Sequence, residues 1–248
     1  MALFSIKDVF IVTGASSGIG KAVALKLIEE GAKVVAIGRN EEKLNELKFD
    51  CINSEHCFIE KADLCEHLSD MSLFLQDLKE KYGKFTGLAY CAGAILLKPA
   101  SATSYDEGLN LFNINYFAPV MMLKSFCDKR ICIGRGASAV AVASADAFLR
   151  EKGLCIYSGT KAALQASFST IAKEVAPRGM RVNTVSPSDI KTPMTMNGSM
   201  QELRLDREKL YPFGYGEPED VAELVVFLLS QKAKWITGHD YIVDCATF

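Results

Sequence analysis

The sequence lacks the features that mark metalloproteins, nucleic-acid-binding proteins and membrane proteins. None of its eight cysteines forms a CxxC pair and its three histidines are scattered, which argues against a metal site and favours buried thiols over disulfides. The net charge is -2 with no long run of one sign, so a basic nucleic-acid surface is missing. No apolar run is long enough to span a bilayer, and the first residues do not resemble a signal peptide. We therefore expect a cytoplasmic protein that binds no metal, nucleic acid or membrane.

No linker, repeat or low-complexity segment divides the 248 residues either. Hydrophobic residues make up 49% of the chain, which is enough for a substantial core. A chain of this length suits one large α/β domain or two small ones, and the lack of a linker favours a single domain over residues 1–248.

Short β-branched runs alternate with helical patterns along the chain. One helical pattern ends at Gly31, a typical C-terminal cap, and the last begins at Pro218, a favoured first-turn residue. Strand, helix and strand repeated in this way predict an α/β Rossmann fold, a doubly wound parallel sheet with helices on both faces. The seven predicted strands are residues 9–14, 33–38, 57–64, 87–93, 138–144, 181–187 and 239–245.

This alternation lapses between Thr192 and about Tyr215. The segment contains Pro193, Gly198 and three methionines. Because a long irregular insertion after a strand is often a substrate lid, we expect a lid over residues 192–215.

The segment TGASSGIG, residues 13–20, follows the first predicted strand and opens a helix. Its glycines permit a sharp turn, close approach of a pyrophosphate to the backbone, and close packing of the helix on the strand. The positive end of the helix would then face the phosphates. We therefore predict that a dinucleotide is bound by Gly14, Ser16, Ser17, Gly18, Ile19 and Gly20.

The second predicted strand ends in GRN, Gly38 to Asn40. A carboxylate here would bind the ribose 2′-hydroxyl of NAD, and the segment contains none. Arg39 can instead make charge-assisted hydrogen bonds to the 2′-phosphate of NADP. We therefore predict NADP (NADPH) as the cofactor, and a solvated Arg39 in an NAD enzyme is the alternative.

The segment YSGTK separates Tyr157 from Lys161 by four residues, which places both side chains on one face if the segment is helical. A lysine charge about 5 Å from the phenol favours the phenolate by roughly 3 kcal/mol, or about two pKa units. A shift of this size suits an acid-base catalyst. A surface tyrosine and lysine on an ordinary helix would have the same spacing. The motif alone therefore does not distinguish a catalytic pair from a surface pair.

Together these motifs resemble the short-chain dehydrogenase/reductase family over essentially the whole chain, including its 3-oxoacyl-(acyl-carrier-protein) reductase-like members. TGASSGIG and YSGTK match the family patterns TGxxxGIG and YxxxK, and Ser144 stands thirteen residues before Tyr157, the usual family spacing. The resemblance implies a catalytic set of Asn115, Ser144, Tyr157 and Lys161. It also implies cofactor binding by Asp63, Leu64, Ala92, Gly93, Tyr157, Lys161, Pro187, Ile190 and Thr192.

The family resemblance also implies a role for each catalytic residue. Tyr157 would donate a proton to a carbonyl oxygen that Ser144 holds by a hydrogen bond. Lys161 would lower the tyrosine pKa and bind the nicotinamide ribose, while Asn115 would support a chain of water molecules.

The sequence departs from the family pattern at three places. Cys91 replaces an asparagine that normally braces the sheet, and Ser188 replaces the glycine of a Pro-Gly pair, where its side chain could narrow the pocket or add a hydroxyl. Near the C-terminus, the family's Asp-Gly-Gly reads Asp244, Cys245 and Ala246.

The substrate pocket is expected to be largely apolar with one carboxylate. Arg135 and Arg178 lie roughly where acyl-carrier-protein-dependent members of the family place docking arginines. Two helical segments, residues 112–123 and 159–176, are apolar or small on nearly every side, which predicts a dimer or tetramer. The predicted pocket residues are Leu96, Leu97, Asp146, Phe148, Cys155, Ser188, Met194 and Met196.

The sequence therefore predicts an NADP-dependent oxidoreductase that transfers a hydride between nicotinamide and a carbonyl or secondary alcohol substrate. Three alternatives stay open: a catalytically idle dinucleotide-binding sensor or scaffold, a reductase specific for 3-oxoacyl thioesters, and an epimerase or dehydratase that retains its cofactor.

Overall fold

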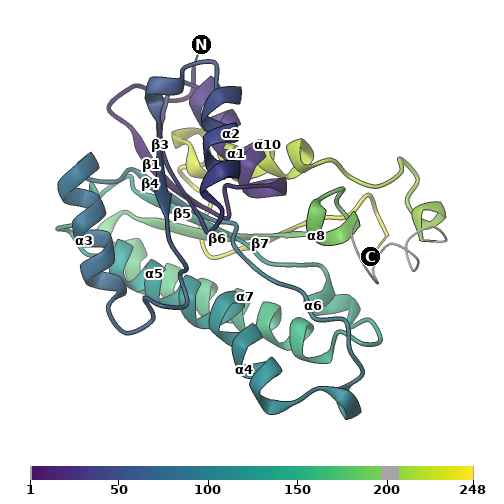
Figure 1. Cartoon of the computed structure of the whole chain (residues 1–248). Helices are drawn as coiled ribbons and strands as arrows, with labels where there is room; N and C mark the ends of the chain where they lie inside the picture. Colours follow the sequence, from purple (N-terminus) through teal and green to yellow (C-terminus); the bar gives the residue numbers. More distant parts are fainter. Residues whose placement is uncertain (1, 197–206, 248) are drawn as a thin grey trace.

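The computed structural model describes residues 2–196 and 207–247, so the middle of the predicted lid, residues 197–206, lies outside the described residues. All seven predicted strands are present, and they form one parallel sheet in the order β3-β2-β1-β4-β5-β6-β7 (Figure 1). The predicted doubly wound Rossmann fold is therefore confirmed. The strands are β1 Val9–Thr13, β2 Lys33–Gly38, β3 Cys57–Lys61, β4 Gly87–Tyr90, β5 Ser138–Val142, β6 Arg181–Pro187 and β7 Asp240–Val243.

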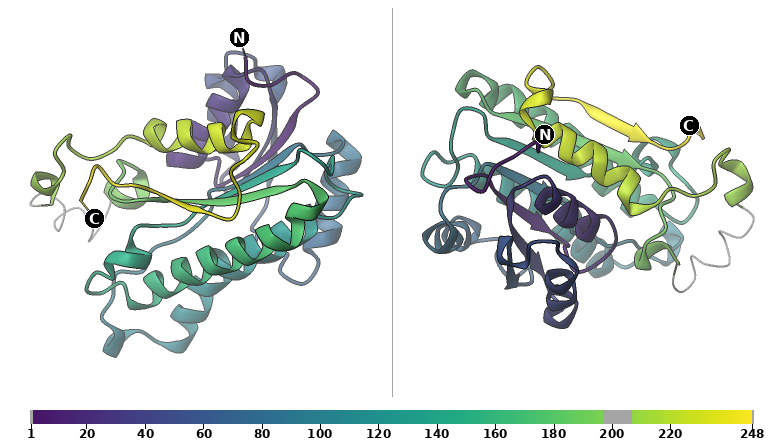
Figure 2. Two further views of the ribbon diagram at one scale, coloured as in Figure 1. Left: turned by 180° about the vertical axis from the view of Figure 1, so that it is seen from behind. Right: turned by 90° about the horizontal axis from the view of Figure 1, so that it is seen from above.

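Helices cover both faces of the sheet, as Figure 2 shows from behind and from above. Side chains alternate along each strand, so Ile11 packs in one core with α3, α5 and α7, and Val12 packs in the other with α1, α2 and α10. The helices are α1 Gly18–Glu29, α2 Glu41–Asp50, α3 Met71–Tyr82, α4 Tyr105–Phe112, α5 Ala118–Phe126, α6 Asp146–Leu149, α7 Cys155–Val175, α8 Pro193–Met196 and α10 Pro218–Leu229.

Five predicted strands are longer than the strands in the structure, namely residues 9–14, 57–64, 87–93, 138–144 and 239–245. Strand β4 ends at Tyr90 because the next two backbone N–H groups, of Cys91 and Ala92, both donate to the Thr13 hydroxyl at 3.1 Å. The chain thereby leaves the strand ladder and turns across the end of β1. The Thr13 hydroxyl therefore joins the end of β1 to the end of β4. It does so at Cys91, the residue that replaces the asparagine of the family pattern.

The segment predicted as one helix over residues 112–123 contains a π-helical turn, Asn113–Phe117, between α4 and α5. Pro119 has no N–H group to donate to the Asn115 carbonyl, which an α-helix would require. The backbone instead widens, and the N–H of Ala118 donates to the Asn113 carbonyl five residues earlier. The sequence analysis missed this turn, although Pro119 signals it.

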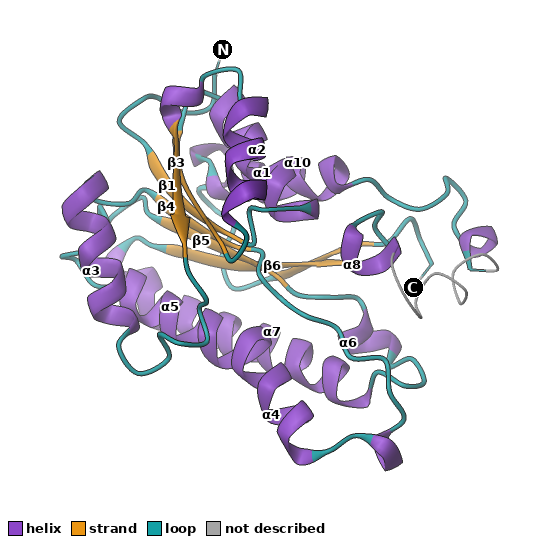
Figure 3. Cartoon of the chain, in the orientation of Figure 1, coloured by secondary structure: helices purple, strands orange, loops and turns teal. Residues whose placement is uncertain are grey.

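Since the strands are parallel, their carboxyl ends lie at one edge of the sheet (Figure 3). The strand order reverses between β1 and β4, and a crevice opens outside such a point in a doubly wound sheet. The two described arms of the predicted lid also start from this edge. Gly216 joins them at their base, because its carbonyl accepts from Lys191 N at 2.9 Å and its N–H donates to the Asp189 carbonyl at 3.2 Å.

The departure from Asp-Gly-Gly near the C-terminus has a backbone consequence. Cys245 and Ala246 both adopt left-handed conformations, with φ values of 56° and 59°. Glycine takes this conformation without steric cost, whereas a residue with a Cβ loses about 1–2 kcal/mol. The chain therefore keeps a backbone suited to two glycines without having them.

All eight cysteines are free. Cys155 is exposed and three others are half-buried, so the expectation of buried thiols holds only for Cys51, Cys57, Cys127 and Cys132. Within residues 2–196 and 207–247, no helix is long and apolar enough to cross a membrane. The same residues contain no group of three or more histidine, cysteine and acidic side chains able to hold a metal ion.

Arg181 joins the sheet to the end of α10. The residue is only 6% exposed, and its guanidinium donates to the carbonyls of Leu228, Leu229 and Ser230 at 2.6, 3.2 and 2.9 Å.

Arg181→Met should lower the free energy of unfolding by about 3 kcal/mol, because several carbonyls lose their donor. Urea unfolding measures this loss. Arg130→Met, which removes an exposed arginine paired with Asp128, is the control, and equal losses in both variants would contradict the assignment.

Candidate active site

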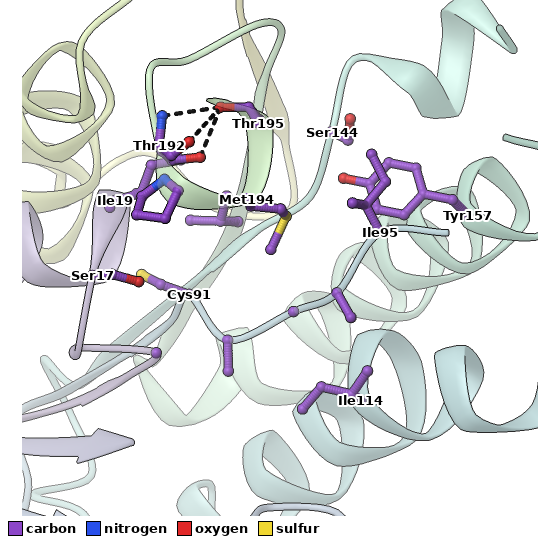
Figure 4. Close-up of a pocket in the computed structure, with 18 of the residues that line it drawn as sticks. Ser17, Ile19, Cys91, Ile95, Ile114, Ser144, Tyr157, Thr192, Met194 and Thr195 are labelled. Carbon is purple, nitrogen blue, oxygen red and sulfur yellow. Dashed lines mark hydrogen bonds between the residues drawn. The ribbon is translucent and has the colours of Figure 1, made fainter. Parts of the chain in front are cut away.

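A cavity of about 960 Å³ lies at the carboxyl edge of the sheet and runs from the glycine-rich loop to the base of the lid. The residues that the sequence analysis assigned to cofactor binding all line this cavity. Figure 4 shows Ser17, Ile19 and Cys91 toward one end and Ser144 and Tyr157 toward the other. Its volume lies at the upper end of the usual range for ligand pockets.

The loop before α1 allows backbone contacts that only glycine permits. A Cβ atom added to Gly20 would lie 2.3 Å from the Gly14 carbonyl oxygen, and one added to Gly14 would lie 2.8 Å from Ala92 N. The side chain of Ser17, the residue before α1, does not cap the helix, and no acidic residue occurs in the first turn. The N–H groups and positive end of α1 are thus available to an anion in the cavity, which fits the pyrophosphate of a dinucleotide.

Two basic side chains line the cavity at the end of β2. The side chain of Arg39 is 80% exposed, and its only described ion pair is a long one of 3.8 Å to Asp63. Asp63 also accepts a hydrogen bond of 2.9 Å from Cys65 N, which holds its carboxylate at the end of β3. Lys43, four residues after Arg39 on the first turns of α2, was missed by the sequence analysis. Arg39 lies before the N-cap residue Asn40, so helical spacing does not relate the two side chains and no motif signalled Lys43.

Ser144, Tyr157 and Lys161 meet at the other end of the cavity. Ser144 follows the end of β5, and α7 carries Tyr157 and Lys161 on one face, so the predicted helical spacing of YSGTK is confirmed. Lys161 Nζ lies 5.8 Å from the centre of the Tyr157 ring and donates to the Val142 carbonyl at 2.9 Å.

Burial lowers the pKa of Lys161 to about 8, since the charged form loses its hydration. The neighbouring thiol of Cys91 is half-buried at the cavity wall, and its loss of hydration raises its pKa to about 12. Cys91 is therefore neutral near pH 7 and does not neutralise the Lys161 charge.

Asn115 is 1% exposed and does not itself line the cavity. Its amide exchanges two hydrogen bonds of 2.9 Å with the backbone of Ala94 and donates to the Thr160 hydroxyl at 3.2 Å. Thr160 lies on α7 between Tyr157 and Lys161. Asn115 therefore ties the loop after β4 to the helix that carries both of these side chains.

A polar cluster that the sequence analysis did not predict lies at the base of the lid. The Ser188 and Tyr211 hydroxyls are 2.6 Å apart, and Tyr211 also donates to Asp189 at 2.9 Å. Arg207 forms ion pairs with Asp189 at 3.2 Å and with Glu151 at 3.3 Å. The hydroxyl that Ser188 adds to the cavity is thus bonded to the lid.

A family model described as enoyl-(acyl carrier protein) reductase matches residues 14–245. The chain belongs to the short-chain dehydrogenase/reductase family. It is 30% identical to an NADP-dependent (R)-specific alcohol dehydrogenase of Lentilactobacillus kefiri, over 95% of this chain and 94% of that protein. It is also 30% identical to an NAD-dependent glycerol dehydrogenase of Listeria innocua, over 97% and 94%. The structure of a short-chain dehydrogenase/reductase of Brucella melitensis, described as glucose/ribitol dehydrogenase, matches with a TM-score of 0.90, 26% identity and coverage of 100% and 99%.

The predicted substrate pocket of this short-chain dehydrogenase/reductase needs correction. Leu96, Leu97, Asp146, Ser188 and Met194 line the cavity as predicted. The residues that do not line it are Phe148, Cys155 and Met196, all of them exposed. Phe148 and Met196 lie on the short helices α6 and α8, and Cys155 is the first residue of α7; none of the three side chains turns into the cavity.

Asp146 begins α6 beside Ser144. Burial, and secondly the charge of Asp189, raise the pKa of Asp146 to about 6, above its ordinary value of 3.8. The folded state holds this proton more tightly than the unfolded state, so protonation of Asp146 stabilises the fold. This contribution to the free energy of unfolding is complete below pH 3.8 and is lost as pH rises through 6.

We expect Asp146→Asn to be more stable than the wild type above pH 6, by about 1–3 kcal/mol, because the amide carries no buried charge. The gain should shrink toward pH 4. The free energy of unfolding, measured between pH 4 and 8, tests this. Asp77→Asn, which removes an exposed charge from α3, is the control; a gain that does not change with pH would contradict the prediction.

Proposed function

We propose that this oxidoreductase is a single domain, residues 1–248, that uses NADPH to reduce carbonyl compounds to secondary alcohols, or catalyses the reverse oxidation. One observation carries the proposal. The glycine-rich loop with the uncapped start of α1, and the side chains of Ser144, Tyr157 and Lys161, line a single cavity from its two ends.

A nicotinamide dinucleotide fits the cavity by chemistry. Backbone N–H groups at the start of α1 would hold the pyrophosphate, and Asp63 and Leu64 line the cavity where the adenosine end would lie. Pro187, Ile190 and Thr192 line it at the nicotinamide end. The bound cofactor would supply a hydride to the carbonyl carbon.

Side chains of this protein would bind the substrate carbonyl oxygen and donate a proton to it. Ser144 would donate a hydrogen bond to the carbonyl oxygen, and Tyr157 would give that oxygen its proton. The ammonium of Lys161 would favour the negative charge that this transfer leaves on Tyr157. Asn115 would act as a positioning residue, since its hydrogen bonds hold α7 against the loop after β4.

We propose NADP rather than NAD because two cations, Arg39 and Lys43, line the cavity at the end of β2, where a 2′-phosphate would lie. The two relatives named above differ in cofactor, NADP in one and NAD in the other. The preference therefore rests on these two side chains.

A thioester on an acyl carrier protein is less well supported. Arg135 and Arg178 precede β5 and β6, whereas the cavity is lined by Val142, Ser144 and Pro187 at the other ends of these strands. A strand of five residues separates the two edges by about 15 Å. In addition, one guanidinium nitrogen of Arg178 donates to the Cys127 carbonyl at 2.7 Å.

We also propose that the protein forms a dimer or tetramer through α5 and α7. On α7, Ala162, Ala166 and Thr170 are exposed on one face, and Phe117, immediately before α5, is 40% exposed. Sedimentation as a monomer at micromolar concentration would contradict this proposal.

Tyr157→Phe should abolish turnover and leave the dissociation constant for NADPH within about threefold of the wild-type value, because only the acidic proton is removed. Absorbance of the nicotinamide with a panel of ketones, keto sugars and β-ketoacyl thioesters measures turnover. Tyr82→Phe, on α3, is the control. Tight NADPH binding without turnover of any substrate in the wild type would favour a sensor instead.

Arg39→Gln should weaken NADPH binding about 10- to 100-fold and change NADH binding little, since a hydrogen bond to a charged group contributes about 1.5–3 kcal/mol. Fluorescence titration with both cofactors measures the two affinities. Arg130→Gln removes an arginine whose side chain is also 80% exposed, but at a site outside the cavity. Equal losses for NADPH and NADH would argue against a 2′-phosphate site.

A further inference from the structure

A carboxylate lies directly beside the hydroxyl proposed to hold the substrate. Asp146 follows Ser144 by two residues, and its backbone N–H donates to Ser144 Oγ at 3.1 Å. Its Oδ2 atom lies 3.4 Å from the same Oγ. A carbonyl oxygen bound to Ser144 at about 2.8 Å would therefore lie within about 6 Å of the Asp146 carboxylate.

Ser144 has one hydroxyl proton, which it can donate either to the Asp146 carboxylate or to a substrate carbonyl oxygen. Among the described residues, the Ser144 hydroxyl is the only hydrogen-bond donor to the Asp146 carboxylate, and at 3.4 Å this bond is long. When Ser144 donates to a carbonyl oxygen, the same proton cannot serve Asp146. Substrate binding would thus leave a partly buried carboxylate without a donor, which is costly unless the substrate provides one.

The other acidic groups of this part of the cavity already have a cation. Asp189 and Glu151 both pair with Arg207, and Tyr211 donates a further hydrogen bond to Asp189. The positive charge of Arg207 also acts on Asp146, but within the described residues Asp146 forms no ion pair. It is therefore the carboxylate left to receive a donor from a ligand.

We propose that Asp146 determines substrate specificity, an inference that rests on the proposed carbonyl reduction. The substrates are then α-hydroxy ketones and the corresponding vicinal diols. The hydroxyl on the neighbouring carbon donates to Asp146 while the carbonyl oxygen accepts from Ser144. Hydride adds to the carbonyl carbon and the Tyr157 proton adds to its oxygen, so the neighbouring hydroxyl forms and breaks no covalent bond.

Two pairs of ketones test this inference, since in each pair a methyl group replaces the hydroxyl at similar size. The pairs are hydroxyacetone with butanone, and α-hydroxyacetophenone with propiophenone. The wild-type kcat/KM should favour the hydroxy ketone at least 100-fold, because a site built to bind a hydroxyl discriminates strongly against its absence. In Asp146→Leu the ratio should fall to about one, and in Asp146→Asn to an intermediate value.

Glu151→Gln is the matched control, because it removes another carboxylate of the same cavity that pairs with Arg207. It should keep the wild-type ratio, and NADPH titration of each variant shows that the cofactor site is intact. A wild-type ratio near one, or a preference that survives Asp146→Leu, overturns the inference while carbonyl reduction stands. Turnover of other ketones but of neither hydroxy ketone also overturns it. Absence of any Tyr157-dependent turnover across the ketone panel overturns the proposed function as well.

Discussion

The close contact between α1 and the end of β1 is the constraint on which the rest of the structure depends. At Gly20 the helix approaches the strand so closely that an added Cβ would lie 2.3 Å from the Gly14 carbonyl oxygen. This contact directs the start of α1 into the crevice between β1 and β4, and it seats the buried face of α1 in the same core as α10. A larger residue at Gly20 would displace the helix from both the core and the cavity.

The end of the cavity that is lined by Ser144, Tyr157 and Lys161 is built at a cost in stability. Lys161 is buried and keeps its charge near pH 7, although burial lowers its pKa from 10.5 to about 8, which corresponds to about 3 kcal/mol. The carboxylate of Asp146 is charged nearby at a similar cost. Hydrogen bonds from Asn115 to the Ala94 carbonyl and from Lys161 to the Val142 carbonyl hold the surrounding backbone in place. Such costly, positioned charges are typical of functional sites.

The sequence analysis succeeded where the local structure depends on a short pattern. The loop from Gly14 to Gly20, and the spacing of Tyr157 and Lys161, are fixed along the chain by a turn or by the period of a helix, and the structure has both. It was less accurate at strand ends, because Cys91 leaves β4 through a hydrogen bond to Thr13, which lies 78 residues earlier. It missed the π-helical turn at Asn115 because the predicted pattern was read as an uninterrupted helix despite Pro119.

By itself the sequence determined the seven strands and the parallel Rossmann class through periodicity. Its short motifs identified the family, and the family resemblance supplied many of the residues that line the cavity, but not Lys43. Only the tertiary structure decided how the substrate end is composed. Ser188, Asp189, Arg207 and Tyr211 join two arms of the chain with Glu151, and Asp146 turns toward Ser144 rather than into solvent. Local patterns specify which face of an element is buried, but the distance between side chains of different elements depends on strand order and on how the connecting segments pack.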